Sequence, residues 1–384
     1  MLKMVDGTGI IGVDMVCPLG GTVSPPQPPN FDKVEVEGVG SLMLPNSLKA
    51  PIERLELIGN SVQGENPAPD NPQEIKSAGK WNKATGKYEI DIILNGSNLW
   101  KEDSMIRGHL TNTGEIIYKE DDSNCIWTVT VPRDGKYAVR IEKESVGGLY
   151  FTRIFNDKTS EPYVRLNPGQ KGALMLKKGE NKIQASSTSA LRPIGNEKVM
   201  LSYDDQEPPT YEPYQEPQTL TLTSDRPITK WDKLAEQGGQ YGWLYKHRIV
   251  NDLSALVKDS EPIYGKDGEK YFSVSLQGAL FNYDYNKIYS VAGLCPKDSK
   301  IHYVPKPMIQ SVVIYVSDTD TIMTAKEHMH YKVIYETTES QFAPLSESEQ
   351  TQLRNLHSYN GTTNIMVDSG EVPCGIKLTY RKEI

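Results

Sequence analysis

Apolar residues alternate with polar ones along most of the chain, most clearly at Ile90, Ile92 and Leu94. A repeat of two places every second side chain on the same face of a β-strand. Many short runs of this kind, separated by glycine-containing turns, are typical of antiparallel β-sandwiches. The pattern predicts an all-β dominated fold: tandem antiparallel β-sandwich domains, jelly-roll-like, with few short helices. The other runs are Trp127/Val129/Val131, Tyr137/Val139/Ile141, Phe272/Val274/Leu276, Val312/Ile314/Val316 and Ile376/Leu378/Tyr380.

Helix signals are few. The clearest combines Ser346 with Glu349, which have the spacing of a capping box at the start of a helix. Leu353 and Leu356 follow at helical spacing and would form one apolar stripe. We expect a helix to begin just after Ser346 and a second, shorter helix over residues 320–328.

Clusters of proline divide the chain into blocks. They fall at residues 25–29, 67–72 and 208–217. The first favours a stiff extended spacer, and the third is the best candidate for a linker between domains. We therefore predict an extended N-terminal arm (1–30), a small β domain (31–96), a β-sandwich (97–210), a proline-rich linker (211–216) and a second β-sandwich with one packed helix (216–384).

Composition and charge restrict the kinds of partner. The chain has 384 residues and a formal net charge of −8, with no basic block. Nucleic acids and anionic membranes both require clustered Lys and Arg, so we expect neither as a partner. No apolar run approaches the roughly 20 residues of a membrane span, and the first residues do not have the pattern of a signal peptide. We expect synthesis in the cytoplasm without secretion.

One sequence motif suggests nucleotide binding but lacks the required context. Residues 7–12 read GTGIIG, and Asp32 follows twenty residues later. A dinucleotide site needs a strand before its glycines and a helix after them. Only six residues precede this motif, and Pro18 with the proline cluster at 25–29 prevents the helix. We interpret the segment as part of the arm and predict no cofactor.

Metal and disulfide chemistry have little support in the sequence. His328 and His330 share one strand face, but no third ligand stands at a sensible spacing. The cysteines are far apart and form no CxxC pair, which predicts reduced thiols and no zinc site. They are Cys17, Cys125, Cys295 and Cys374.

Catalytic motifs are equally absent. The sequence contains no GxSxG, no HExxH and no family-type cysteine motif, so we predict that the protein is not an enzyme. A polysaccharide hydrolase is harder to exclude, because its two carboxylates can come from any part of the fold.

Aromatic residues supply the candidate binding residues. The chain has 21 Tyr against 6 Phe and 5 Trp. Tyrosine suits recognition surfaces, because its ring is apolar and its hydroxyl can form hydrogen bonds. One group, around Trp243, could equally form the core of a sheet, whereas the other is interleaved with Asn and Asp like a binding loop. The candidate carbohydrate-binding residues are Trp243, Tyr283, Asp284 and Tyr285.

Four stretches of the chain resemble tail, baseplate or minor structural proteins of phages and prophages of Firmicutes. They are similar in order and spacing to segments of that family. The stretches are Leu55–Gly79, Ser97–Trp100, Tyr211–Leu234 and Phe342–Ile365. The N-terminal arm and the C-terminal end, which lacks a fibre or coiled-coil extension, depart from the family pattern.

The resemblance implies a structural component of a virion tail, assembled in the host bacterial cytoplasm and contributing to attachment to a host surface glycan. It implies jelly-roll-like, carbohydrate-binding-module-like sandwiches. Its protein partners would be other tail or baseplate proteins, contacted through the N-terminal arm, and further copies of the same chain, which would form a trimer by analogy. Its possible ligand would be a cell-wall or capsular glycan. Two alternatives stay open: a dedicated lectin-like receptor-binding protein, and a tail-associated polysaccharide depolymerase.

Overall fold

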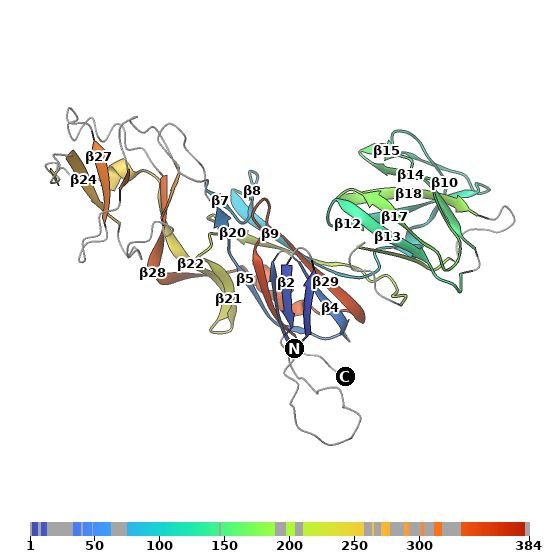
Figure 1. The fold of residues 1–384 in the computed structure, drawn as a ribbon, viewed down its shortest axis with the longest axis horizontal. Coiled ribbons are helices and arrows are strands. Elements are labelled where there is room, and N and C mark those ends of the chain that lie inside the picture. The colour runs from blue at the N-terminus through green and yellow to red at the C-terminus, as the bar shows by residue number, and fades with distance from the viewer. Residues whose placement is uncertain are drawn as a thin grey trace, which may run out of the picture.

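The computed structural model shows a chain built almost entirely of antiparallel β-strands, as predicted, with a single α-helix among the residues it describes. Figure 1 shows a central body, with one group of strands extending from each side of it. The structure describes residues 2–6, 9–13, 34–39, 41–47, 49–62, 75–145, 147–188, 197–203, 210–256, 263–264, 270–276, 288–291, 301–302, 311–316 and 332–380.

The central body consists of a nine-stranded sheet and a five-stranded sheet. The larger sheet has, in spatial order, β1 (Leu2–Asp6), β2 (Gly9–Val13), β3 (Val34–Val39), β30 (Gly375–Tyr380), β5 (Ile52–Ile58), β21 (Lys233–Gln237), β22 (Gln240–Val250), β28 (Lys332–Pro344) and β25 (Ile288–Val291). The smaller has β20 (Gln218–Ser224), β9 (Lys87–Gly96), β29 (Gly361–Asp368) and β4 (Ser41–Ser47), with β8 (Lys80–Asn82) paired to β9.

Strands from both ends of the chain share one core in this body. Leu57 of β5 pairs with Ile376 of β30, and Ile90 of β9 pairs with Leu222 of β20. All four side chains are buried in the same apolar cluster, together with Trp243. Among the described residues, the segments predicted as a small domain at 31–96 and a separate sandwich at 216–384 thus share one apolar cluster, which differs from the predicted division.

A second sandwich is inserted between β9 and β20. Its core contains only residues between Leu99 and Tyr203, which lie inside the predicted range of 97–210. Its larger sheet has β11 (Ile116–Tyr118), β10 (Ile106–Leu110), β12 (Asn124–Val131), β18 (Gly179–Ser187), β14 (Leu149–Asn156), β15 (Lys158–Ser160) and β16 (Val164–Leu166); its smaller sheet has β17 (Lys171–Leu176), β13 (Gly135–Ile141) and β19 (Val199–Tyr203).

A four-stranded sheet lies on the opposite side of the body from this inserted sandwich (Figure 1). All its strands fall between β22 and β28 in the sequence. They are β23 (Ile263–Tyr264), β24 (Lys270–Ser275), β27 (Ser311–Val316) and β26 (Ile301–His302). The short pair β6 (Ser61–Val62) and β7 (Lys76–Ser77) and two 3-10 turns, η1 (Glu102–Ser104) and η2 (Leu253–Leu256), complete the described elements.

The α-helix α2 (Glu347–Asn355) begins where the sequence predicts it. Ser346 is its N-cap, and Glu349 completes the capping box. Leu353 and Leu356 are buried in the core of the body. The predicted helix at 320–328 lies outside the described residues. Because α2 lies beside β20, it covers an edge strand that would otherwise be open to pairing with another chain.

The N-terminal segment differs from the predicted extended arm. β1 and β2 form an antiparallel hairpin, and Gly12 of β2 pairs with Glu37 of β3. Residues 2–13 thus extend the nine-stranded sheet. Residues 9–12 of the glycine motif lie within β2, whose neighbours β1 and β3 are antiparallel to it, which is not the strand–turn–helix context of a dinucleotide site.

Two of the four cysteines lie in the described residues, and both are free and fully buried. Burial raises the pKa of the Cys374 thiol to about 11 and also raises that of Cys125. Because the thiolate is the reactive form, we expect neither to be alkylated by iodoacetamide in the native protein at pH 8. Mass spectrometry should find both modified only after denaturation. Rapid native labelling of Cys374 would contradict the burial described here.

Candidate functional site

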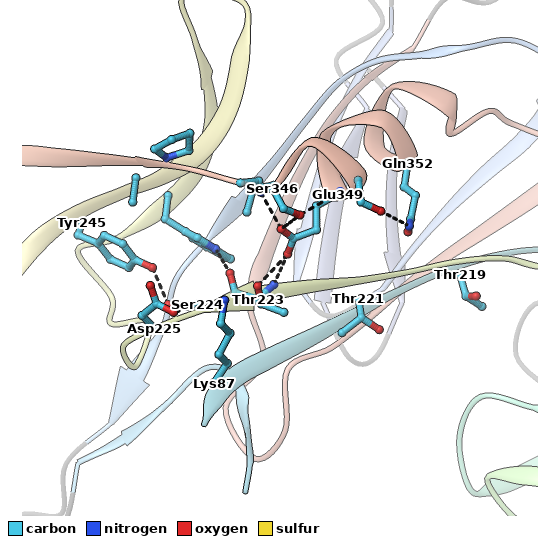
Figure 2. A pocket seen from close by; sticks show the side chains of 15 residues that line it. Lys87, Thr219, Thr221, Thr223, Ser224, Asp225, Tyr245, Ser346, Glu349 and Gln352 are labelled. Atoms are coloured by element: carbon cyan, nitrogen blue, oxygen red, sulfur yellow. Dashed lines mark hydrogen bonds and ion pairs between the residues drawn. The ribbon is translucent and has the colours of Figure 1, made fainter. Parts of the chain in front are cut away.

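The main candidate site is a polar cleft of about 560 Å³ in the central body. It lies where the edge strand β20 meets α2 and the ends of β22 and β28 (Figure 2). Fifteen side chains line it: Lys87, Thr219, Thr221, Thr223, Ser224, Asp225, Trp243, Tyr245, Ala343, Pro344, Leu345, Ser346, Ser348, Glu349 and Gln352.

Two aromatic residues of β22 line one side of the cleft. Trp243 and Tyr245 stack with their ring centroids 6.5 Å apart. The indole Nε1 of Trp243 donates to the Thr223 carbonyl at 2.9 Å, and the Tyr245 hydroxyl is 2.5 Å from Ser224 Oγ. Burial raises the pKa of Tyr245 to about 12, so its hydroxyl stays protonated at neutral pH. Both rings are therefore fixed by the core on one side and by hydrogen bonds on the other.

Glu349 forms the wall contributed by the helix. One carboxylate oxygen accepts from the Ser346 backbone N–H at 2.9 Å, which closes the capping box. The other accepts from the Thr223 backbone N–H at 2.7 Å and from the Thr223 hydroxyl at 3.0 Å. The carboxylate thus joins helix to strand and has little capacity left for a general acid or base role.

Several of the remaining lining groups are polar and accessible. Lys87 Nζ lies 3.5 Å from Asp225, and both side chains are well exposed. Gln352 donates to Ser348 at 3.3 Å, and Thr221 donates to Asp91 at 2.7 Å. Hydroxyl, amide and amine groups of this kind suit a polyhydroxylated ligand, which can exchange hydrogen bonds with each of them.

A fully buried pair of titratable side chains joins β22 to the residues just before β21. Asp232 and His247 have fully buried side chains, with His247 Nδ1 2.7 Å from Asp232 Oδ2. Asp232 also accepts from the Thr229 backbone N–H and hydroxyl, both at 2.7 Å, and from the Lys246 backbone N–H at 2.8 Å. Neither ring nitrogen of His247 has a well-aligned hydrogen-bond partner among the described residues. The pair is inaccessible to a substrate, so we assign it to stability.

The sequence identified only one residue of this cleft as a binding candidate. Trp243 is 2% exposed and belongs to the core of the body, so in the cleft it shapes the wall rather than offering an open face. The other candidates, Tyr283, Asp284 and Tyr285, lie outside the described residues, as do His328 and His330.

Sequence reasoning missed the threonine side of the cleft. Thr219, Thr221 and Thr223 alternate with buried leucines along β20, so their side chains share the outer face of an edge strand. The repeat TLTLT was a usable signal, since alternating threonines on a sheet edge present a row of hydroxyls.

No family model, curated protein or solved structure matches the chain. Within the described residues, no three His, Cys, Asp or Glu side chains are grouped so that they could hold a metal ion. In the same part of the chain, no helix has the length and apolar character needed to cross a membrane.

Proposed function

We propose that this chain is a non-enzymatic structural component of the tail or baseplate of a phage or phage-like particle, and that it contributes to attachment to a host surface glycan. The resemblance of four sequence stretches to that class motivates the proposal. The structural observation that carries it is the braced junction between the body and the inserted sandwich, since parts of a particle must hold their domains in a fixed relation.

Ionic contacts brace one side of this junction. Lys178, in the turn between β17 and β18 of the sandwich, pairs with Asp368 of β29 in the body. Lys80 of β8 approaches the same carboxylate at 3.3 Å. Asp368 is only 18% exposed, so its interaction with two cations is less screened than that of a surface pair.

The segment that leads from the inserted sandwich back to β20 (residues 211–216) holds the other side of the junction. Glu212 is buried and accepts from the Thr362 backbone N–H at 3.0 Å and from its hydroxyl at 2.9 Å. The Tyr211 hydroxyl donates to Glu102 at 2.7 Å, and Lys101 pairs with Glu216. Both connections of the insertion are therefore attached to ordered structure, which limits hinge motion.

The proposal is tested on particles and on the purified protein. Mass spectrometry and immunogold labelling of purified particles should place the chain in the tail, together with other tail proteins and in multiple copies, three by analogy. Incubation with purified cell-wall polysaccharide should release no reducing ends. Absence from particles, or release of reducing ends that one acidic substitution abolishes, would overturn the proposal.

The second candidate function is a dedicated lectin-like receptor-binding protein, which the polar cleft beside β20 favours. The two functions predict different effects of deleting the gene for this chain. Particles lacking a receptor-binding protein should assemble but fail to adsorb, whereas particles lacking a structural component should not assemble.

The junction gives a specific prediction. Lys178→Ala removes the link to Asp368 and should free the sandwich, which small-angle scattering would detect as a larger radius of gyration. Limited proteolysis should cut the proline-rich linker (211–216) faster. The matched control is Lys177→Ala, because Lys177 pairs with Asp134 inside the sandwich at 3.1 Å. Identical scattering from both variants would show that the ionic contact does not hold the junction.

The same contact should depend on pH. Partial burial raises the pKa of Asp368, but the hydrogen bonds from Lys178 and from the Gly370 backbone N–H, together with the charges of Lys80 and Lys178, outweigh it and hold the pKa below its usual value. A carboxyl with a lowered pKa contributes stability above its unfolded value, about 4, and loses it as pH falls through the folded value. The junction should therefore stay closed at pH 5 and open only below about pH 4.

A further inference from the structure

One exposed tyrosine of the inserted sandwich has an unfavourable backbone. Tyr163 has φ +50° and is 60% exposed. A bulky residue with positive φ is rare and strained, so surrounding contacts must hold it there. Exposure means that its ring contributes little buried area in return. A strained, exposed aromatic residue is a candidate for recognition.

Several contacts fix Tyr163 in this position. Its hydroxyl donates to Glu161, and Glu161 lies 3.6 Å from the guanidinium of Arg153. Arg153 in turn donates to the Leu110 carbonyl. The ring of Tyr163 lies beside that of Tyr150, with centroids 6.5 Å apart and the ring planes at 36°. The result is a preorganised pair of tyrosine rings at the surface.

Strand register places polar side chains beside this pair. Tyr150 of β14 is directly opposite Ser186 of β18 and Arg165 of β16, and Ser186 is directly opposite Asn124 of β12. Directly opposed residues of antiparallel strands project to the same face. The next residues along each strand, Cys125, Ala185 and Phe151, are buried in the core, so this row faces outward. We call Tyr163, Tyr150, Ser186, Asn124 and Arg165 the tyrosine row.

We propose that the tyrosine row is a glycan-binding site of the inserted sandwich. This inference rests on the proposed role in glycan attachment and assigns that role to a place. A sugar ring stacks through its C–H face on a tyrosine, while its hydroxyls meet an amide, a hydroxyl and a guanidinium. The row is half-buried to exposed, so a ligand can reach it.

Two other kinds of ligand fit the row poorly. A peptide cannot add as a strand, because residues 149–151 of β14 are already paired with β18 on one side and with β16 on the other. A nucleic acid needs several clustered cations, whereas the row has Arg165 and lies beside the carboxylate of Glu161. Of the three kinds of ligand, a largely neutral and hydroxyl-rich glycan with a flat ring face fits the row best.

The test measures binding of the whole chain to an array of defined oligosaccharides of glucose, galactose, N-acetylglucosamine and rhamnose. Tyr150→Ala and Tyr163→Gly should each weaken binding by about threefold to tenfold, the loss expected for one stacked ring. Multivalent display on beads should amplify the difference. Tyr118→Ala is the control, because Tyr118 is 67% exposed on β11 of the same sandwich and lies outside the row.

Thermal melting separates recognition from folding. Glycine adopts positive φ without strain, so Tyr163→Gly should melt no lower than Tyr163→Ala while losing binding. If the wild type binds a sugar and both row variants keep full affinity, the site is wrong while the glycan role stands. If the wild type binds no probe on the array, the proposal of a glycan-binding site is wrong. The structural role is tested independently, by detecting the chain in particles. A large melting loss in Tyr163→Gly would assign the residue to stability and overturn the proposal.

Discussion

Replacing Trp100 by alanine is expected to unfold the inserted sandwich at a much lower temperature while the body keeps its own transition. Trp100 is 1% exposed at the centre of the sandwich core. Its ring lies 5.1 Å from that of Trp127 and 6.0 Å, edge to face, from that of Phe151. Truncating a buried aromatic residue of this size costs about 3–5 kcal/mol. For a domain of this size that lowers its melting temperature by roughly 10 °C or more.

Scanning calorimetry checks this expectation. The body and the sandwich have separate apolar cores with no residue in common, so the wild type should show two transitions. Only one should move in Trp100→Ala. The matched control is Trp81→Ala, which removes the same ring from a position 52% exposed in the body and should shift melting little. A single transition that moves as a whole would mean that the two cores unfold together.

The strands and the helix cap could be predicted because their signals are local. All six alternating runs named from the sequence fall in strands, with Leu276 lying one residue beyond the end of β24, and Ser346 with Glu349 forms the predicted capping box. The partners of those strands could not be predicted. Alternation marks which face of a strand is buried but not which strand lies next to it. Leu57 and Ile376 therefore read as parts of two domains, although they are directly paired in one sheet.

The candidate sites, like the strand partners, depend on contacts between distant segments that local sequence patterns do not reveal. The cleft combines residues 219–225, 243–245 and 343–352, which are brought together only by the sheet order. Glu349 was identified as a capping residue, but its bonds to Thr223 of β20 require tertiary structure. The stripe around Trp243 could have been core or binding surface, and its 2% exposure places it in the core. The positive φ of Tyr163 has no signature in its residue type.

Replacing Asp232 by alanine is expected to destabilise the body by about 3–5 kcal/mol, the cost of breaking a buried charged network. Asp232 is 1% exposed and accepts three hydrogen bonds, two from Thr229 and one from the Lys246 backbone. Alanine leaves those buried donors without their acceptor. It also removes the carboxylate oxygen that lies 2.7 Å from Nδ1 of the buried His247.

The body's calorimetric transition should therefore fall by roughly 6–20 °C in Asp232→Ala, while that of the sandwich stays in place. Asp232→Asn keeps the shape and one acceptor oxygen, so it should lose less. The control is Asp225→Ala, which removes a carboxylate that is 85% exposed and should leave both transitions within about 2 °C of the wild type. Since the network ties the β20–β21 connection to β22, equal melting of Asp232→Ala and Asp225→Ala would show that the buried pair does not stabilise the body.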